Sequence, residues 1–178
     1  GQVNVPIVIR MAGGAGSQLG AQHSQSLEGW YAHIPGLKVV VPATPYDAKG
    51  LLKSAIRDNN PVVSFECSRL ATATGPVPDG DHLVPSGVAE VKRAGRDITI
   101  VATSSMVGVA LGAAKMLDEV GISAEVIDPR TTWPLDKQAL IDSAKKTSRA
   151  LVVDEGYERY GVTAEIASVI AAGAFYHL

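Results

Sequence analysis

Short apolar segments alternate with longer amphipathic segments through the second half of this chain of 178 residues. β-branched runs predict strands at 98–102, 124–128 and 150–154. Apolar residues at helical spacing predict helices at 104–120, 136–146 and 162–172. Strands joined by helices of this length form βαβ units with right-handed crossovers. This half of the sequence therefore predicts an open α/β layer with a parallel sheet.

The first forty residues begin a similar order of segments. A buried strand is predicted at 5–9, and the Gly-rich loop 13–20 follows it. Ser24 or Ser26 could then cap a short helix, because both hydroxyls precede a run with apolar residues on one face. A second strand is expected at 38–41.

The clearest helix start lies just after this second strand. Thr44, Pro45 and Asp47 place a capping hydroxyl, a first-turn proline and an acid in the order that favours a helix N-terminus. The turn 58–61 ends the helix, and the strand 62–65 follows. The first block is thus predicted to run strand, loop, helix, strand, helix, strand.

Periodicity fades between the two blocks, which we interpret as a connection that crosses a surface. The predicted organisation is a domain over 1–70, a linker over 71–96 and a domain over 97–178. The predicted fold class is α/β, with two open parallel-sheet layers. The length of 178 residues allows two small domains.

Composition excludes several classes of protein. Sixteen Lys and Arg stand against 18 Asp and Glu, and no basic run exceeds Lys145-Lys146, so nucleic acid is not expected as a partner. The single cysteine, Cys67, excludes an internal disulfide and a Cys-rich metal site. Apolar runs fall short of the roughly 20 residues that span a bilayer, so no membrane partner is expected.

His23 is the first candidate for chemistry. It follows the Gly-rich loop at the carboxyl side of a predicted strand, where open α/β sheets place ligands, and imidazole suits proton transfer near neutral pH. On spacing alone, a structural histidine that caps the next helix is the favoured alternative. The loop 13–20 lacks the glycine spacing of dinucleotide-binding and P-loop motifs, so it predicts a tight turn rather than a phosphate site.

Two other turns could hold ligands. The turn 58–61 follows a helix C-terminus, whose free carbonyls could hold a monovalent cation, although water or a cap usually satisfies them. The turn 154–157, Asp-Glu-Gly-Tyr, is a plausible site because it ends a strand, but a solvated turn is the favoured interpretation. Side-chain metal ligands are not expected, because the four histidines are scattered.

Ordered motifs in both blocks carry a resemblance to a known family. They are the segments 23–28, 32–40, 42–52 and 56–61 of the first block and 95–101, 121–131 and 161–166 of the second. Together they closely resemble the β subunits of thiamine-diphosphate-dependent 2-oxo acid dehydrogenase E1 components. The resemblance implies the rear part of a transketolase-like pyrimidine-binding domain, followed by the front of a transketolase C-terminal domain. The family's N-terminal part and C-terminal tail are expected to lie outside this sequence.

The resemblance also implies a cofactor and partners. Members form heterotetramers of two α and two β subunits, with thiamine diphosphate at the α/β interface and its Mg2+ held by the α subunit. The family's Mg2+-binding motif is lacking here, since Asp79-Gly80-Asp81 has the wrong order. The glutamate that contacts the pyrimidine would lie before Gly1, so no cofactor-binding residue is assigned. The expected partners are an E1 α subunit, a second β subunit and the lipoyl-bearing acyltransferase E2.

Site residues transfer by position. His23 matches the family's active-site histidine, which handles protons during decarboxylation or reductive acylation, and this reverses the interpretation from spacing. Backbone carbonyls that bind a structural K+ in family members match Ile7, Ala55, Ile56, Asp58 and Asn60. The segment 67–73 departs from the family, which usually has a Leu-Tyr pair there, so either the local packing or a substrate-specific contact is expected to differ.

The expected function is therefore that of a β-subunit fragment of a 2-oxo acid dehydrogenase E1 component, with pyruvate dehydrogenase favoured. It would take part in oxidative decarboxylation and acyl transfer to lipoyl domains, as an oxidoreductase of the EC 1.2.4 type, and the isolated fragment is expected to be inactive. An acetoin dehydrogenase β subunit is the nearest alternative. A non-catalytic assembly module is the alternative from another class. The expected location is the cytoplasm, or the mitochondrial matrix in a eukaryote.

Overall fold

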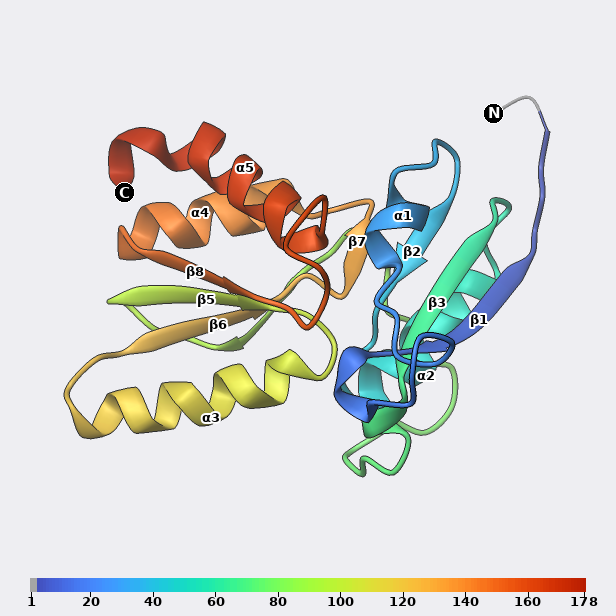
Figure 1. Cartoon of the computed structure of the whole chain (residues 1–178), viewed down its shortest axis with the longest axis horizontal. Helices are drawn as coiled ribbons and strands as arrows, with labels where there is room; N and C mark the ends of the chain where they lie inside the picture. Colours follow the sequence, from blue (N-terminus) through green and yellow to red (C-terminus); the bar gives the residue numbers. More distant parts are fainter. Residues whose placement is uncertain (1–2) are drawn as a thin grey trace.

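Two four-stranded sheets organise the computed structural model, which describes residues 3–178 (Figure 1). The first sheet has the order β1-β3-β2-β7. Its strands are β1 (Val8–Gly13), β2 (Lys38–Val40), β3 (Val62–Cys67) and β7 (Thr131–Trp133). The first three are parallel, with Val8 and Lys38 both paired to Val62 across β3, and β7 is antiparallel to β2. The first sheet thus takes its fourth strand from the second half of the chain.

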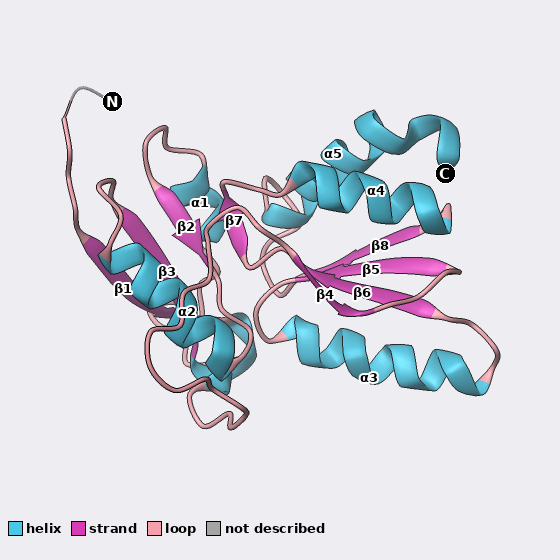
Figure 2. Ribbon diagram, turned by 180° about the vertical axis from the view of Figure 1, so that it is seen from behind, coloured by secondary structure: helices cyan, strands magenta, loops and turns pink. Residues whose placement is uncertain are grey.

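The second sheet has the order β4-β6-β5-β8. Its strands are β4 (Glu90–Arg93), β5 (Ile98–Ala102), β6 (Ala124–Asp128) and β8 (Ala150–Val153). β5, β6 and β8 are parallel, with Ile98 paired to Ala124 and Thr99 to Ala150, whereas β4 is antiparallel to β6. β4 is an edge strand of this sheet, and β7 is the edge strand of the first sheet that faces the second (Figure 2).

Helices cover both faces of each sheet. The α-helices are α1 (Glu28–Ala32), α2 (Pro45–Ile56), α3 (Met106–Glu119), α4 (Lys137–Thr147) and α5 (Val162–Ala174), with short 3-10 turns at Ala15–Ser17, Ser68–Leu70 and Phe175–His177. In Figure 1 α3 lies on one side of the second sheet and α4 and α5 on the other.

Alternate residues of each strand divide the core between these layers. Val101 and Ile127 pack with α4 and α5, whereas Ile100 and Val126 pack with α3. In the first sheet, Val40 packs with α2 on one face, and the opposite face packs with α1. Period-two strands between two helical layers therefore produce the three-layer cross-section.

The structure confirms the predicted α/β class and adds an antiparallel edge strand to each parallel sheet. The segments predicted at 98–102 and 124–128 have the observed bounds of β5 and β6. β1 begins and ends later than the predicted 5–9, so Gly13 belongs to the strand. β4 falls within the stretch 71–96, and β7 follows β6 directly; neither has an apolar period that would predict a strand.

Charged side chains join the two halves in the interior, and we call them the interdomain charge cluster: Asp47, Glu90, Lys92, Asp128 and Arg130. Asp47 is fully buried, and its carboxylate lies 2.8 Å from Arg130 Nε and 2.7 Å from Lys92 Nζ. Lys92 also lies 3.7 Å from Asp128 Oδ2. Burial raises the pKa of Asp128 to about 7, against the opposing effects of a backbone N–H and Lys92.

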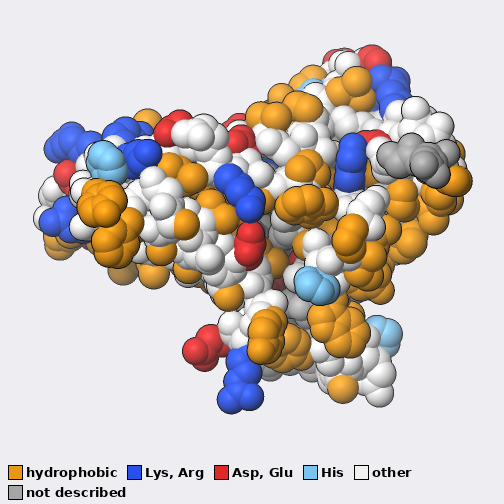
Figure 3. All heavy atoms as spheres, turned by 90° about the horizontal axis from the view of Figure 1, so that it is seen from above, with side chains coloured by type: hydrophobic (Ala, Val, Ile, Leu, Met, Phe, Trp, Pro, Cys, Tyr) orange, Lys and Arg blue, Asp and Glu red, His pale blue; other side chains and the backbone are white. Residues whose placement is uncertain are grey.

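The outer edge of the first sheet is apolar. Val5, Ile7 and Ile9 are exposed although they lie on or beside β1, the strand at this edge. Hydrophobic side chains are visible over the N-terminal lobe in the space-filling view (Figure 3). Within residues 3–178, no helix combines the length and the apolar character needed to cross a membrane.

Candidate functional site

His23 lies in a turn between the Gly-rich loop and α1. β1 ends at Gly13, and the chain then bends through Gly14, whose φ of 108° is readily available to glycine alone. The backbone N–H of His23 donates to the carbonyl of Gly20 at 3.4 Å. Its imidazole is exposed and forms no hydrogen bond with any described residue. The structure thus places a free imidazole beside the loop that follows β1, and its catalytic role stays a prediction.

Glu155 connects the Gly-rich loop to the second domain. Its carboxylate accepts hydrogen bonds from the backbone N–H of Gly16 at 2.8 Å, from Ser105 Oγ at 2.6 Å and from Cys67 Sγ at 3.4 Å. Burial would raise the pKa of Glu155, but the bonds from Ser105 and Gly16 outweigh it, so that this pKa is lowered. Glu155 is therefore held as a carboxylate where four segments meet.

The loop approaches this carboxylate closely because it contains glycine. A Cβ atom on Gly14 would lie 2.8 Å from Cys67 Sγ and 3.2 Å from Glu155 Oε1. A Cβ on Gly16 would lie 2.4 Å from Arg69 Nη1 and 3.0 Å from Glu155 Oε2. The glycines thus serve close contact with Glu155, which adds a physical reason to the tight turn predicted for this loop.

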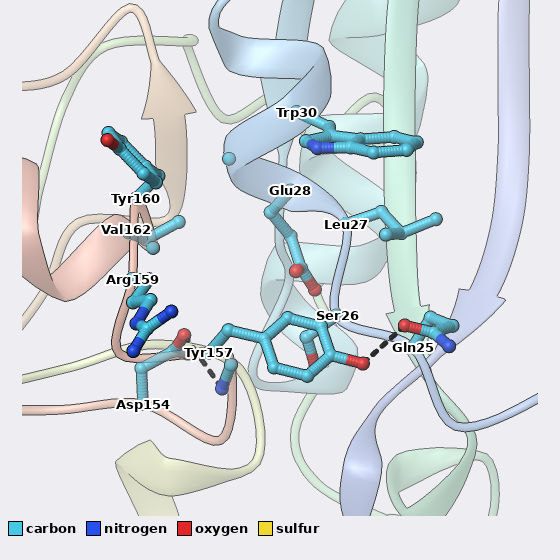
Figure 4. Close-up of a pocket in the computed structure, with 13 residues that line it drawn as sticks. Gln25, Ser26, Leu27, Glu28, Trp30, Asp154, Tyr157, Arg159, Tyr160 and Val162 are labelled. Atoms are coloured by element: carbon cyan, nitrogen blue, oxygen red, sulfur yellow. Dashed lines mark hydrogen bonds between the residues drawn. The ribbon is translucent and has the colours of Figure 1, made fainter. Parts of the chain in front are cut away.

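The turn 154–157 is not the solvated turn favoured from the sequence. Asp154 accepts a hydrogen bond from Thr103 Oγ1 and, at 3.1 Å, from the N–H of Gly156. Tyr157 donates its hydroxyl hydrogen to Gln25 Oε1 across 2.5 Å (Figure 4). The carboxyl end of β8 therefore faces the loop that carries His23, and side chains from both join the two domains.

A cavity of about 480 Å3 lies between the segment 25–30 and the segment 154–162. Its lining includes Ser26, Glu28 and Tyr157, and the carboxyl group of Glu28 points into it (Figure 4). Burial, reinforced by the nearby charges of Asp154 and Glu155, raises the pKa of Glu28 to about 7 against a backbone hydrogen bond. The oxygen of Ser26 is buried without a hydrogen-bond partner among the described residues. Glu28 can therefore exchange a proton near neutral pH.

The predicted cation site lies where α2 ends beside the start of β1. The carbonyl of Ile7 accepts from the N–H of Val62 at 3.0 Å, which leaves this oxygen a second lone pair. The carbonyl of Ala55 accepts from the N–H of Asp58 at 3.2 Å and also from the N–H of Arg57. The side chain of Asp58 accepts from the N–H of Asn60 at 2.9 Å and pairs with Lys38. Burial raises the pKa of Asp58, but Lys38 and Asn60 lower it further than burial raises it.

K+ binding by Ile7, Ala55, Ile56, Asp58 and Asn60 therefore stays a prediction that rests on backbone oxygens. Within residues 3–178, no group of three His, Cys, Asp or Glu side chains could hold a metal ion. Cys67 is buried and unbridged, and burial raises the pKa of its thiol above the usual value.

Sequence reasoning missed the partners of the turn 154–157. The position of Glu155 and Tyr157 at the end of a parallel strand was a valid signal, because strand ends of this kind line ligand crevices. Nothing in the sequence indicates that Gly16 and Gln25 are their partners. The sequence likewise does not indicate that Arg130 pairs with Asp47. An acid in the first turn of a helix is common, so Asp47 gives no sign of a second partner.

Comparison with known proteins agrees with the two-part architecture. Residues 1–72 match the family model of the transketolase pyrimidine-binding domain, and residues 87–178 match that of the transketolase C-terminal domain. A solved structure, "Split gene transketolase, inactive beta4 tetramer", is similar with a TM-score of 0.80 and 26% identity, over 95% of this chain and 55% of that chain.

Three curated relatives are similar over nearly the whole chain. The pyruvate dehydrogenase E1 component subunit beta-1 of Arabidopsis thaliana, named as mitochondrial, is 48% identical over 100% of this chain and 50% of its own length. The acetoin:2,6-dichlorophenolindophenol oxidoreductase subunit beta of Bacillus subtilis is 47% identical, over 98% and 51%. The 2-oxoisovalerate dehydrogenase subunit beta of the same species is 46% identical, over 97% and 53%.

The chain spans about half the length of these relatives. The order of the two matched domains along the chain is also the order of the two sheets in the structure. The chain therefore belongs to the transketolase-like family that includes the β subunits of 2-oxo acid dehydrogenase E1 components.

Proposed function

We propose that this chain is part of the β subunit of a thiamine-diphosphate-dependent 2-oxo acid dehydrogenase, with pyruvate as the favoured substrate. The observation that carries the proposal is 46–48% identity to oxidoreductase β subunits over at least 97% of the chain. The assembled enzyme would decarboxylate the oxo acid oxidatively and transfer the acyl group to a lipoyl domain.

The residues fit a shared thiamine site in which this chain supplies proton handling. His23 offers an exposed imidazole on a loop that Glu155 holds through the N–H of Gly16. An exposed imidazole can reach a cofactor that is bound between this chain and another subunit. Thiamine diphosphate supplies an electron sink for the carbanion formed on decarboxylation. We assign its diphosphate and Mg2+ to the α subunit, as the resemblance to E1 β subunits implies. His23 would give or accept a proton near the reacting carbon.

Partners follow from the same proposal. An E1 α subunit, a second β subunit and a lipoyl-bearing E2 would complete the enzyme. The exposed apolar edge at β1 supports burial of this side in an assembly. A K+ ion bound by the carbonyls near Ile7 and Ala55 would tie the start of β1 to the end of α2. Relatives named mitochondrial in plants, and bacterial relatives, support the matrix or the cytoplasm as the location.

An acetoin-cleaving enzyme is the second candidate. It is favoured by the Bacillus subtilis acetoin oxidoreductase subunit, which is 47% identical to this chain. The two candidates would share His23 and differ in whether a 2-oxo acid or a 2-hydroxy ketone is cleaved.

A substrate panel tests both candidates. The full-length subunit that contains this sequence is co-expressed with its α subunit and assayed with pyruvate, 2-oxoisovalerate and acetoin, using a dye as electron acceptor. We expect turnover that requires thiamine diphosphate and falls at least about 100-fold in His23→Ala. His33→Ala, at an exposed position after α1, is the matched control and should retain activity. Absence of thiamine-dependent turnover on all three substrates would refute the proposal, and full activity of His23→Ala would leave only an assembly role.

A further inference from the structure

The second domain holds the loop 16–25, which contains His23, at two points, one on each side of the histidine. Before His23, the backbone N–H of Gly16 donates to Glu155 Oε2 at 2.8 Å. After it, Gln25 Oε1 accepts the hydroxyl hydrogen of Tyr157 at 2.5 Å. Both acceptor and donor on the second domain belong to one turn, which follows β8 directly. The eight residues between the two contacts therefore form a loop anchored at both ends.

The side-chain amide of Gln25 connects Tyr157 to the turn that contains His23. The side-chain Nε2 of Gln25 donates to the carbonyl of Ala21 at 2.9 Å. The backbone carbonyl of Gln25 accepts from the N–H of Gly14 at 3.3 Å. The side chain of Gln25 thus spans the turn from Ala21 to Gln25, with His23 at its middle. A displacement of this amide would displace the backbone on which the imidazole stands.

We propose that Tyr157 is a positioning residue that fixes the imidazole of His23 through Gln25. The inference rests on the catalytic role of His23 in the proposed function. The ring of Tyr157 is 57% exposed, so it is no core residue. Its hydroxyl reaches across the cavity to Gln25, as Figure 4 shows. The second domain, which carries no residue assigned to the chemistry, would in this way set the geometry of a catalytic group in the first.

The physical reason is loss of orientation rather than loss of a reacting group. Without the hydroxyl, the oxygen of Gln25 would turn to water, and the loop would sample more conformations. The imidazole would then spend less time at the position required for proton transfer. Removal of one such hydrogen bond corresponds to about a 3- to 10-fold effect. Because Tyr157 would not contact the substrate, kcat should fall while KM stays unchanged.

Tyr157→Phe tests this in the reconstituted enzyme, since it deletes only the hydroxyl. Tyr176→Phe is the matched control, because that tyrosine is 95% exposed and its ring packs edge-on against Phe175. We expect kcat to fall about 3- to 10-fold in Tyr157→Phe alone, with unchanged KM and unchanged melting temperature. Gln25→Met should lower kcat as well, and adding Tyr157→Phe to it should cause no further loss, because the two share one hydrogen bond.

Amide hydrogen exchange of residues 19–25 supplies a readout that does not need turnover. Tyr157→Phe should speed this exchange at least about 3-fold, and Tyr176→Phe should not. Wild-type kcat and wild-type exchange in Tyr157→Phe, or additive effects of Tyr157→Phe and Gln25→Met, would overturn the inference. An inactive wild-type enzyme would instead refute the proposed function, and the exchange rates would still decide whether Tyr157 holds the loop.

Discussion

The guanidinium Nε of Arg130 lies 2.8 Å from Oδ1 of Asp47, inside the protein and between its two halves. Asp47 is fully buried in the first turn of α2, whereas Arg130 follows β6 and is only 9% exposed at its side chain. Removing one partner of a buried ion pair leaves the other charge without compensation, which costs more than the pair itself contributes.

Arg130→Met should therefore lower the free energy of unfolding by about 3 kcal/mol, the lower end of the usual range, because Lys92 still pairs with Asp47. Urea denaturation followed by circular dichroism measures the change. The control is Arg10→Met, which removes an ion pair to Glu66 whose arginine side chain is 60% exposed, and it should cost below about 1 kcal/mol. Equal losses in the two variants would contradict a special role for the interior pair.

Glu28 should make stability depend on pH. Burial raises its pKa in the folded state to about 7, whereas an unfolded glutamate titrates near 4.3. The folded state therefore binds more protons between about pH 4 and 7, so the free energy of unfolding should fall as pH rises through this window. Glu28→Gln should flatten that fall when urea unfolding is compared at pH 5 and pH 7.5. Glu158→Gln, which removes an exposed carboxylate from the loop after β8, should keep the wild-type slope.

Glycine substitutions should separate close packing from helix propensity. A Cβ on Gly95 would lie 2.1 Å from the backbone carbon of Ala124, so Gly95→Ala forces the two segments apart. We expect a loss of more than about 2 kcal/mol. Gly112→Ala is the matched substitution in α3, where a Cβ meets nothing within 4 Å, and it should stabilise by about 0.5–1 kcal/mol. A stabilised Gly95→Ala variant would show that the observed spacing of these segments is wrong.

Potassium should stabilise the protein if the carbonyls of Ile7, Ala55, Ile56, Asp58 and Asn60 bind it. An ion that binds the folded state alone raises the melting temperature by mass action. Thermal melts in KCl and NaCl at equal ionic strength provide the measurement, and the melting temperature should be higher in KCl. Identical melting curves over a wide range of K+ concentration would rule the site out.

Strand prediction succeeded where burial on both faces leaves a local signature. β5 contains a continuous β-branched run and β6 contains the pair Val126-Ile127, because helices cover both faces of their sheet, and the bounds of both strands agree with those predicted. β4 and β7 contain Glu-Val-Lys-Arg and Thr-Thr-Trp, which have no such period. Their backbones become strands because β6 and β2 offer free edges, and that information lies elsewhere in the chain.

In the candidate site, too, local sequence indicates some residues but not the contacts between distant segments. His23 could be found from the motif around it and from its place after a strand and a Gly-rich loop. The contacts of Glu155 with Gly16 and of Tyr157 with Gln25 join residues more than 130 positions apart. They depend on how the two domains pack, so local sequence could suggest the turn 154–157 as a site but not its partners.

The strand β7 makes the two halves one mechanical body. The chain leaves the second sheet at the end of β6, pairs through β7 with Val39 and Val40 of β2 in the first sheet, and then returns to the second domain as α4. Separation of the halves would require the hydrogen bonds between β7 and β2 to break and β7 to leave the first sheet. Rotation of the two halves about a hinge would therefore have to break the pairing of β7 with β2. A cut in the connecting stretch 71–89 would leave the two halves joined through β7.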